Sequence, residues 1–180
     1  MHNVMFHNPV RIHFGKGQIA ALAQEIPAGS RVLMTYGGGS IKKNGVYDQV
    51  KKSLTTCVLH EFGGIEPNPT YETCMQAAAI AKAEQLDFIL AVGGGSVLDG
   101  SKFIAAAARY AGEDPWDLVL GKAAIESAMP LGCVLTLPAT GSEMNAFSVV
   151  SRKGTQQKRA FGSSHVLPRF SILDPETTFS

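Results

Sequence analysis

A glycine tetrapeptide that occurs twice, each time directly after an apolar run, constrains this chain more than any other feature. The sequence Gly-Gly-Gly-Ser stands at residues 37–40, after Arg31 to Tyr36, and again at residues 93–96, after Phe88 to Val92. Glycine permits backbone torsions and close approaches that a Cβ forbids, so a strand can pass into a helix within very few residues. The two tetrapeptides therefore predict two strand-to-helix junctions within one α/β domain.

Apolar runs alternate with amphipathic segments along the whole chain, which is typical of β-α-β units with right-handed crossovers. This pattern predicts a Rossmann-like, doubly wound α/β fold, with a mainly parallel sheet, helices on both faces and an N-terminal β-hairpin that turns near Asn8 and Pro9. Strands are expected near residues 10–14, 31–36, 57–62, 88–92, 131–137, 147–151 and 170–173, with a polar turn at 156–159. Helices are expected near residues 18–26, 46–54, 71–85 and 96–109, and Thr70 is placed to cap the third of these.

Composition excludes several classes of protein. The 180 residues carry 16 Lys+Arg and 15 Asp+Glu, a formal net charge of +1, so no basic surface for nucleic acid or anionic lipid is expected. The apolar runs are too short to cross a membrane. Three cysteines in odd number and without a C-x-x-C pair predict neither a disulfide framework nor a zinc ribbon. We therefore expect a cytoplasmic protein.

The second tetrapeptide has the character of a phosphate-binding loop. It joins a continuously apolar strand to a helix whose first N–H groups and positive dipole end point outward, and ligands of such folds bind at the carboxyl ends of the strands. A G-x-G-x-x-G fingerprint is absent because Leu98 stands where the third glycine would be. The order Ser101-Lys102 reverses that of a Walker A loop, which disfavours phosphoryl transfer without removing it as an alternative.

Asp99 and Lys102 follow on the same predicted helix, and two interpretations of them stay open. In one, they compensate the helix dipole and form an i, i+3 ion pair. In the other, Asp99 accepts hydrogen bonds from a cofactor or substrate and Lys102 adds positive potential. The histidines and cysteines show no ligand spacing, so no metal site is predicted within this chain.

Five motifs, in order along nearly the whole chain, carry a resemblance to a known family. They are Tyr36-Gly-Gly-Gly-Ser40, Gly64-Ile-Glu-Pro-Asn-Pro69, Ala91-Val-Gly-Gly-Gly-Ser-Val-Leu-Asp-Gly100, Asp114-Pro-Trp116 and Leu135-Thr-Leu-Pro-Ala-Thr-Gly-Ser-Glu143. With them the chain resembles the iron-containing alcohol dehydrogenases, especially the bacterial NADPH-dependent aldehyde reductases and butanol dehydrogenases.

The resemblance implies an N-terminal α/β domain that binds NAD(P) and a helical domain that holds a divalent metal, iron or zinc, to polarise the oxygen of the substrate. Residues 1–180 would be the first domain of such an enzyme, and the metal ligands would lie beyond Ser180. The residues implied to bind the cofactor are Gly37, Gly38, Gly39, Ser40, Asn68, Gly93, Gly94, Gly95, Ser96, Asp99, Thr136, Thr140, Ser142, Asn145 and Lys158. Asp99 and Lys102 are further expected to support catalysis.

Within this resemblance, the first glycine loop favours NADP(H) over NAD(H). Relatives that prefer NAD place an acidic residue there, whereas Gly39 leaves room for a 2′-phosphate, Ser40 can donate to it, and Lys42 and Lys43 add positive charge. The expected substrate is a small alcohol or aldehyde, and a homodimer could form through the N-terminal hairpin at the edge of the sheet. The alternative is a stand-alone dinucleotide-binding module without catalysis.

Overall fold

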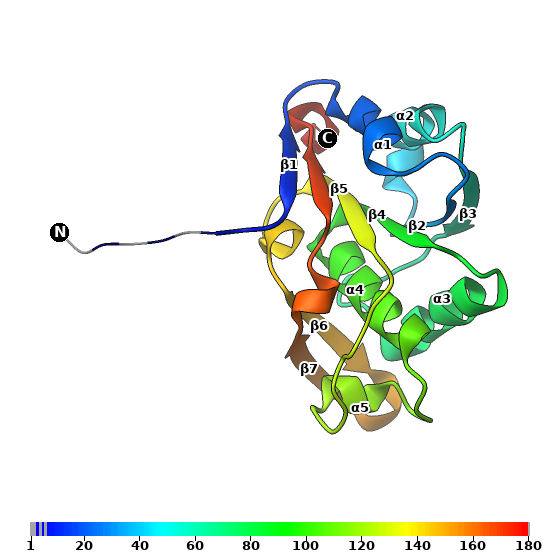
Figure 1. The fold of residues 1–180 in the computed structure, drawn as a ribbon, viewed down its shortest axis with the longest axis vertical. Coiled ribbons are helices and arrows are strands. Elements are labelled where there is room, and N and C mark those ends of the chain that lie inside the picture. The colour runs from blue at the N-terminus through cyan, green and yellow to red at the C-terminus, as the bar shows by residue number, and fades with distance from the viewer. Residues whose placement is uncertain (1–2, 4, 6, 180) are drawn as a thin grey trace.

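The computed structural model describes residues 3, 5 and 7–179, and its centre is a six-stranded sheet (Figure 1). Every neighbouring pair in this sheet is parallel, and the strand order is β1-β8-β5-β4-β2-β3. These strands are β1 (Arg11–Phe14), β2 (Arg31–Tyr36), β3 (Val58–Phe62), β4 (Phe88–Gly94), β5 (Leu131–Leu137) and β8 (Phe170–Leu173). The helices are α1 (Leu22–Glu25), α2 (Val46–Ser53), α3 (Tyr71–Ala83), α4 (Gly95–Arg109) and α5 (Trp116–Val119).

Helices cover both faces of the sheet, as the sequence predicts. Successive side chains of a strand point to opposite faces, and the two hydrophobic cores follow this alternation. Leu33 and Ile89 pack in one core with residues of α3 and α4, whereas Val32 and Leu90 pack in the other with residues of α1 and α2. The doubly wound α/β fold is therefore confirmed.

Two local predictions are confirmed in detail. The side chain of Thr70 accepts a hydrogen bond from the N–H of Thr73 and so caps α3. The strand β4 passes directly into α4, because the strand includes Gly94 and the helix begins at Gly95. All β4 side chains from Phe88 to Val92 are buried, as expected for a central strand that is covered on both faces.

Between residues 147 and 162 the structure differs from the sequence prediction. The expected polar turn at 156–159 is wrong, because the turn lies at Lys153–Thr155, Gln156 adopts a left-handed φ of 52°, and a strand follows. β6 (Phe147–Arg152) and β7 (Gln157–Gly162) form an antiparallel hairpin apart from the main sheet, at the opposite end of the domain from α1 and α2 (Figure 1). Four of the six residues of β7 are exposed and only Phe161 is buried, so apolar alternation could not reveal this strand.

The predicted N-terminal hairpin lies partly outside the described residues. Its second arm is present as β1, which lies at one edge of the sheet and pairs in parallel with β8. Its expected first arm includes residues 1, 2, 4 and 6, which lie outside the described residues. In the described part of the chain, no helix has the length and apolar character needed to cross a membrane.

Candidate functional site

A cavity of about 530 Å³ lies at the carboxyl ends of β2, β4 and β5. From β2 the chain moves outward to β3, then returns past β2 to β4 and continues to β5, so the direction of winding reverses between β2 and β4. Such a reversal leaves a crevice because the loops after the two strands lead to helices on opposite faces. Both glycine tetrapeptides lie in this crevice, and its volume is in the usual range for a small-molecule site.

The second tetrapeptide presents the start of α4 to the cavity. Gly94 at the cap position has no side chain that could accept from the first N–H groups of the helix. These groups and the positive end of the helix dipole therefore stay available to an anion. A Cβ on Gly95 would collide with the side chain of Thr140, so only glycine fits at this junction.

The first tetrapeptide forms the opposite wall. Gly39 has a φ of 96°, in the left-handed region that glycine enters without strain, and a 3-10 turn begins at Ser40. The backbone is fixed behind this loop, because the N–H of Gly64 donates to the Gly37 oxygen at 2.9 Å. Every described residue that lines the cavity is uncharged, so backbone dipoles and hydroxyl groups would provide most of the attraction for a phosphate.

Asp99 and Ser142 lie side by side behind the second glycine loop. Oγ of Ser142 donates to Oδ1 of Asp99 at 2.7 Å, and the N–H of Val149 donates to Oδ2 at 3.0 Å. A carboxylate has further lone pairs, so Asp99 keeps acceptor capacity beyond these two bonds. The contacts join α4 to the loop after β5 and to the β6–β7 hairpin.

Lys102 is fully buried in the same region. Its Nζ donates to Oγ of Ser142 at 2.9 Å, to the Phe147 oxygen at 2.8 Å, and to two oxygens of Asn145 at 2.8 and 3.1 Å. Burial lowers the pKa of Lys102 to about 8, although the negative charges of Asp99 and Glu143 oppose the shift. One interpretation of the sequence predicts a direct ion pair between Asp99 and Lys102; in the structure both side chains instead contact the Ser142 hydroxyl, which accepts from Lys102 and donates to Asp99.

Three further predicted residues meet at the margin of the cavity, beside Pro67. Nζ of Lys158 donates to Oδ1 of Asn68 at 2.6 Å, and the N–H of Asn68 lies 3.3 Å from Oγ of Ser96. Asn68 has a left-handed φ of 60°, which asparagine tolerates better than most residues. Lys158 thus places a positive charge beside the second glycine loop.

The predicted residues therefore fall into three groups. Nine line the cavity: Gly37, Gly38, Gly39, Ser40, Gly93, Gly94, Gly95, Ser96 and Thr136. Thr140, Asn68 and Lys158 contact that lining or its margin, and Asp99, Ser142 and Asn145 belong to the internal network with Lys102. Sequence reasoning missed Ile41, Asn44, Ile65, Pro67, Val92, Val97, Leu137, Thr177, Thr178 and Phe179. Residues 177–179 come from a distant segment, and no local pattern marks them.

The lining fits a dinucleotide better than a metal ion. Two neighbouring glycine loops, an uncapped helix start and a hydroxyl on each loop suit an extended ligand with phosphate groups. Among the residues that the structure describes, no three His, Cys, Asp or Glu side chains are grouped to hold a metal.

Comparison with known proteins adds independent findings. The model of the family described as iron-containing alcohol dehydrogenase matches residues 9–175. The NADPH-dependent aldehyde reductase YqhD of Escherichia coli is 58% identical over 182 residues, which cover 100% of this chain and 47% of that protein. The probable NADH-dependent butanol dehydrogenase 1 of Bacillus subtilis is 49% identical, with the same two coverages. The chain spans about half the length of the curated relatives it matches.

Solved structures agree with this. The crystal structure of E. coli YqhD superposes with a TM-score of 0.93 at 59% identity, over 98% of this chain and 46% of that one. The NADH-dependent butanol dehydrogenase A of Thermotoga maritima gives a TM-score of 0.94 at 45% identity, over 100% and 46%. The fold is therefore shared with the corresponding part of both proteins.

Proposed function

The chain belongs to the iron-containing alcohol dehydrogenase family, and from this premise we propose that residues 1–180 form the NAD(P)-binding domain of an alcohol or aldehyde oxidoreductase. The single observation that carries the proposal is the cavity between β2 and β4, lined by both glycine tetrapeptides. A small primary alcohol or aldehyde is the proposed substrate class, because the names of the relatives include aldehyde reductase and butanol dehydrogenase.

In this proposal, the nicotinamide supplies or accepts a hydride when the cofactor is bound. The chain's own residues bind and orient the cofactor. Gly94, Gly95 and Ser96 would hold the pyrophosphate at the start of α4, while Gly38, Gly39 and Ser40 would surround the ribose of the adenosine. Lys158 and Asn145 would lie toward the nicotinamide half, as the resemblance implies. Asp99 would keep Ser142 in place by accepting its hydroxyl proton in a hydrogen bond.

We propose NADP(H) as the preferred cofactor. Support comes from Gly39 and Ser40 in the cavity lining, where the loop carries no carboxylate that would repel a 2′-phosphate. Lys42 lies near this loop. Its Nζ is 5.0 Å from the centre of the Tyr36 ring and forms an ion pair with the carboxylate of Glu61 at 3.6 Å. The relatives include both NADPH-dependent and NADH-dependent enzymes. Membership of the family therefore does not determine which cofactor is preferred, and the affinities of this chain for NADPH and NADH must be measured.

The metal of the proposed reaction, iron or zinc, would be held by residues outside these 180. We therefore expect this chain alone to bind the cofactor without catalysing turnover. A cytoplasmic location and a homodimer remain predictions from the sequence.

Phosphoryl transfer is disfavoured. A Walker-type lysine must reach the phosphate groups of the nucleotide, whereas Lys102 is fully buried, lies outside the cavity lining and donates to four oxygens of the protein. This geometry assigns the ammonium group to the interior of the domain.

A titration tests the proposal. NADPH fluorescence is followed while the chain is added, and the experiment is repeated with NADH. Separate assays measure ATP hydrolysis, and butanal reduction with and without Zn²⁺ or Fe²⁺. We expect NADPH to bind roughly tenfold tighter than NADH, by one charge-assisted contact to the 2′-phosphate, and no turnover. Equal affinities would refute the cofactor preference. Butanal reduction would contradict the claim that catalysis needs residues outside this chain, and ATP hydrolysis would restore the phosphoryl-transfer alternative.

A further inference from the structure

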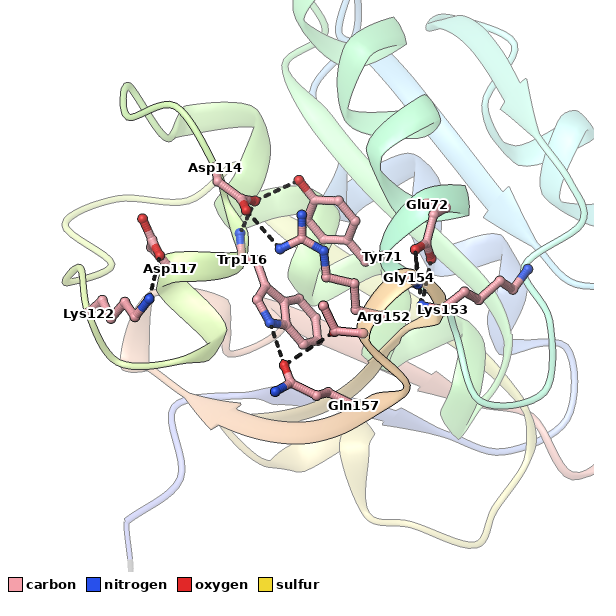
Figure 2. A network of polar contacts seen from close by, with 11 residues as sticks. Tyr71, Glu72, Asp114, Trp116, Asp117, Lys122, Arg152, Lys153, Gly154 and Gln157 are labelled. Carbon is pink, nitrogen blue, oxygen red and sulfur yellow. Dashed lines mark hydrogen bonds and ion pairs between the residues drawn. The ribbon is translucent and has the colours of Figure 1, made fainter.

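A cluster of aromatic and charged side chains holds the β6–β7 hairpin to the rest of the domain, with Arg152 at its centre (Figure 2). The guanidinium carbon of Arg152 lies 4.5 Å from the centre of the Tyr71 ring and 5.7 Å from that of Trp116. Its Nη1 donates to Oδ2 of Asp114 at 2.7 Å. One cation is thus held by two rings and a carboxylate, an arrangement that a planar guanidinium satisfies better than an ammonium group.

Asp114 ties the cluster together. Its Oδ1 accepts from the hydroxyl of Tyr71 at 2.8 Å and from the N–H of Trp116 at 2.9 Å. Burial raises the pKa of Tyr71 to about 12, with a further contribution from Asp114. Burial alone would raise the pKa of Asp114. Hydrogen bonds from the Trp116 N–H and from the side chains of Arg152 and Tyr71 outweigh burial and keep this pKa below its ordinary value. The cluster therefore keeps one protonation state at neutral pH.

The hairpin is fixed on both sides of its turn. Nε1 of Trp116 donates to Oε1 of Gln157 at 3.2 Å, which holds the start of β7 (Figure 2). The carboxylate of Glu72 accepts from the N–H groups of Lys153 and Gly154. The N–H of Ser151 also donates to the Pro69 oxygen at 2.9 Å, so the hairpin lies directly against the loop that carries Asn68.

Lys158 follows Gln157 and lies opposite Ser151 in the hairpin. A lysine side chain on the surface samples many rotamers, and holding it in one place requires a fixed backbone and a fixed partner. The cluster fixes the backbone, and Oδ1 of Asn68 is the partner at 2.6 Å. We propose that Arg152 is a positioning residue, which holds the hairpin so that the Lys158 ammonium stays beside Asn68 and the second glycine loop to meet the nicotinamide half of the dinucleotide. This inference rests on the proposed function.

Binding measurements with two ligands test the proposal. NADPH carries the nicotinamide half, whereas adenosine 2′,5′-bisphosphate lacks it and probes the adenosine half alone. The variants are Arg152→Gln, Arg152→Lys, Lys158→Met and the double variant of Arg152→Gln with Lys158→Met. Asp117→Asn is the matched control. Asp117 lies in the same short helix as Trp116, and its carboxylate forms an ion pair with the exposed Lys122 at 3.8 Å, away from the Arg152 cluster (Figure 2).

We expect Arg152→Gln to weaken NADPH binding roughly tenfold, as the loss of one hydrogen bond to a charged group would, and to leave the bisphosphate affinity unchanged. Arg152→Lys should fall between wild type and Arg152→Gln, and Asp117→Asn should match wild type. The double variant should bind NADPH as Lys158→Met does, because Arg152 acts through Lys158. Unchanged NADPH affinity in Arg152→Gln, equal losses for both ligands, or additive losses in the double variant would each overturn the proposal.

An NMR measurement without nucleotide separates this proposal from the proposed function. The side-chain amide signal of Asn68 should move in Lys158→Met and move to the same position in Arg152→Gln. If Arg152→Gln leaves that signal at its wild-type position, the positioning role is wrong even where NADPH binds. If wild type binds neither ligand, the proposed function fails, and the NMR result still decides whether Arg152 places Lys158.

Discussion

Lys102 makes the stability of this domain depend on pH in a way that one substitution can reveal. The folded chain lowers the pKa of Lys102 from 10.5 to about 8, mainly by burial. Below pH 8 the lysine is protonated in both the folded and the unfolded state, and the folded state bears the full penalty for a buried charge. Between pH 8 and 10.5 the folded state loses the proton first, so the unfolded state binds more protons and the free energy of unfolding rises with pH.

The magnitude follows from the two pKa values. One pKa unit corresponds to about 1.4 kcal/mol, so the whole effect is roughly 3 kcal/mol, of which about 1 kcal/mol appears between pH 7 and pH 9. Lys102→Met removes the titrating group and keeps a side chain of similar length. We therefore expect the free energy of unfolding of wild type, relative to Lys102→Met, to rise by about 1 kcal/mol between these two pH values.

The assay is urea denaturation of wild type and variant at pH 7 and pH 9, analysed by linear extrapolation. Lys122→Met serves as the control, because the Lys122 side chain is 67% exposed, and its difference from wild type should not change with pH. A difference between wild type and Lys102→Met that stays constant, or that falls from pH 7 to pH 9, would refute the reasoning.

Three other substitutions test separate parts of the structure. Gly95→Ala should weaken NADPH binding more than tenfold, since its Cβ would displace the Thr140 side chain, which packs against the second glycine loop. Gly154→Ala, with open space at its Cβ, should bind NADPH as wild type does in the same titration. Gly38→Asp places a carboxylate in the first glycine loop at a position with open space for a Cβ and no left-handed φ. It should weaken NADPH binding roughly tenfold by repelling the 2′-phosphate and leave NADH binding unchanged or tighter, and similar losses for both cofactors would contradict the role of this loop. Thr70→Ala should lower the free energy of unfolding by about 1 kcal/mol through the loss of the α3 cap. Urea denaturation measures this, with Thr155→Ala in the exposed hairpin turn as the control. Equal stabilities of the two variants would contradict the capping role.

Sequence patterns predicted the elements in which buried and exposed residues follow a regular order along the chain. The continuously apolar run of β4 and the polar residue before α3 each have one straightforward structural outcome, and both outcomes are observed. β7 has no such pattern, because most of its side chains face solvent on a hairpin outside the main sheet. Its position depends on contacts such as that between Trp116 and Gln157, which are 41 residues apart.

The candidate site could likewise be predicted only in part. The glycine loops were predictable because glycine at a strand end has few structural alternatives, and both line the cavity. The placement of Lys102 was not, because a lysine is buried only where several acceptors converge, and its acceptors on Ser142, Asn145 and Phe147 lie 40 or more residues away. Thr177 to Phe179 likewise reach the cavity from the segment after β8.

The central claim is that a nicotinamide dinucleotide binds between the two glycine loops, and an amide NMR titration of the chain with NADPH tests it most directly. A second cavity of about 570 Å³, lined by residues that include Gly17, Ala20 and Thr55, provides an internal comparison of similar size. The account predicts that NADPH shifts the amide signals of Gly38, Gly39 and Gly94–Ser96 and leaves those of the second cavity in place. Shifts confined to the second cavity, or no shifts at millimolar NADPH, would contradict it.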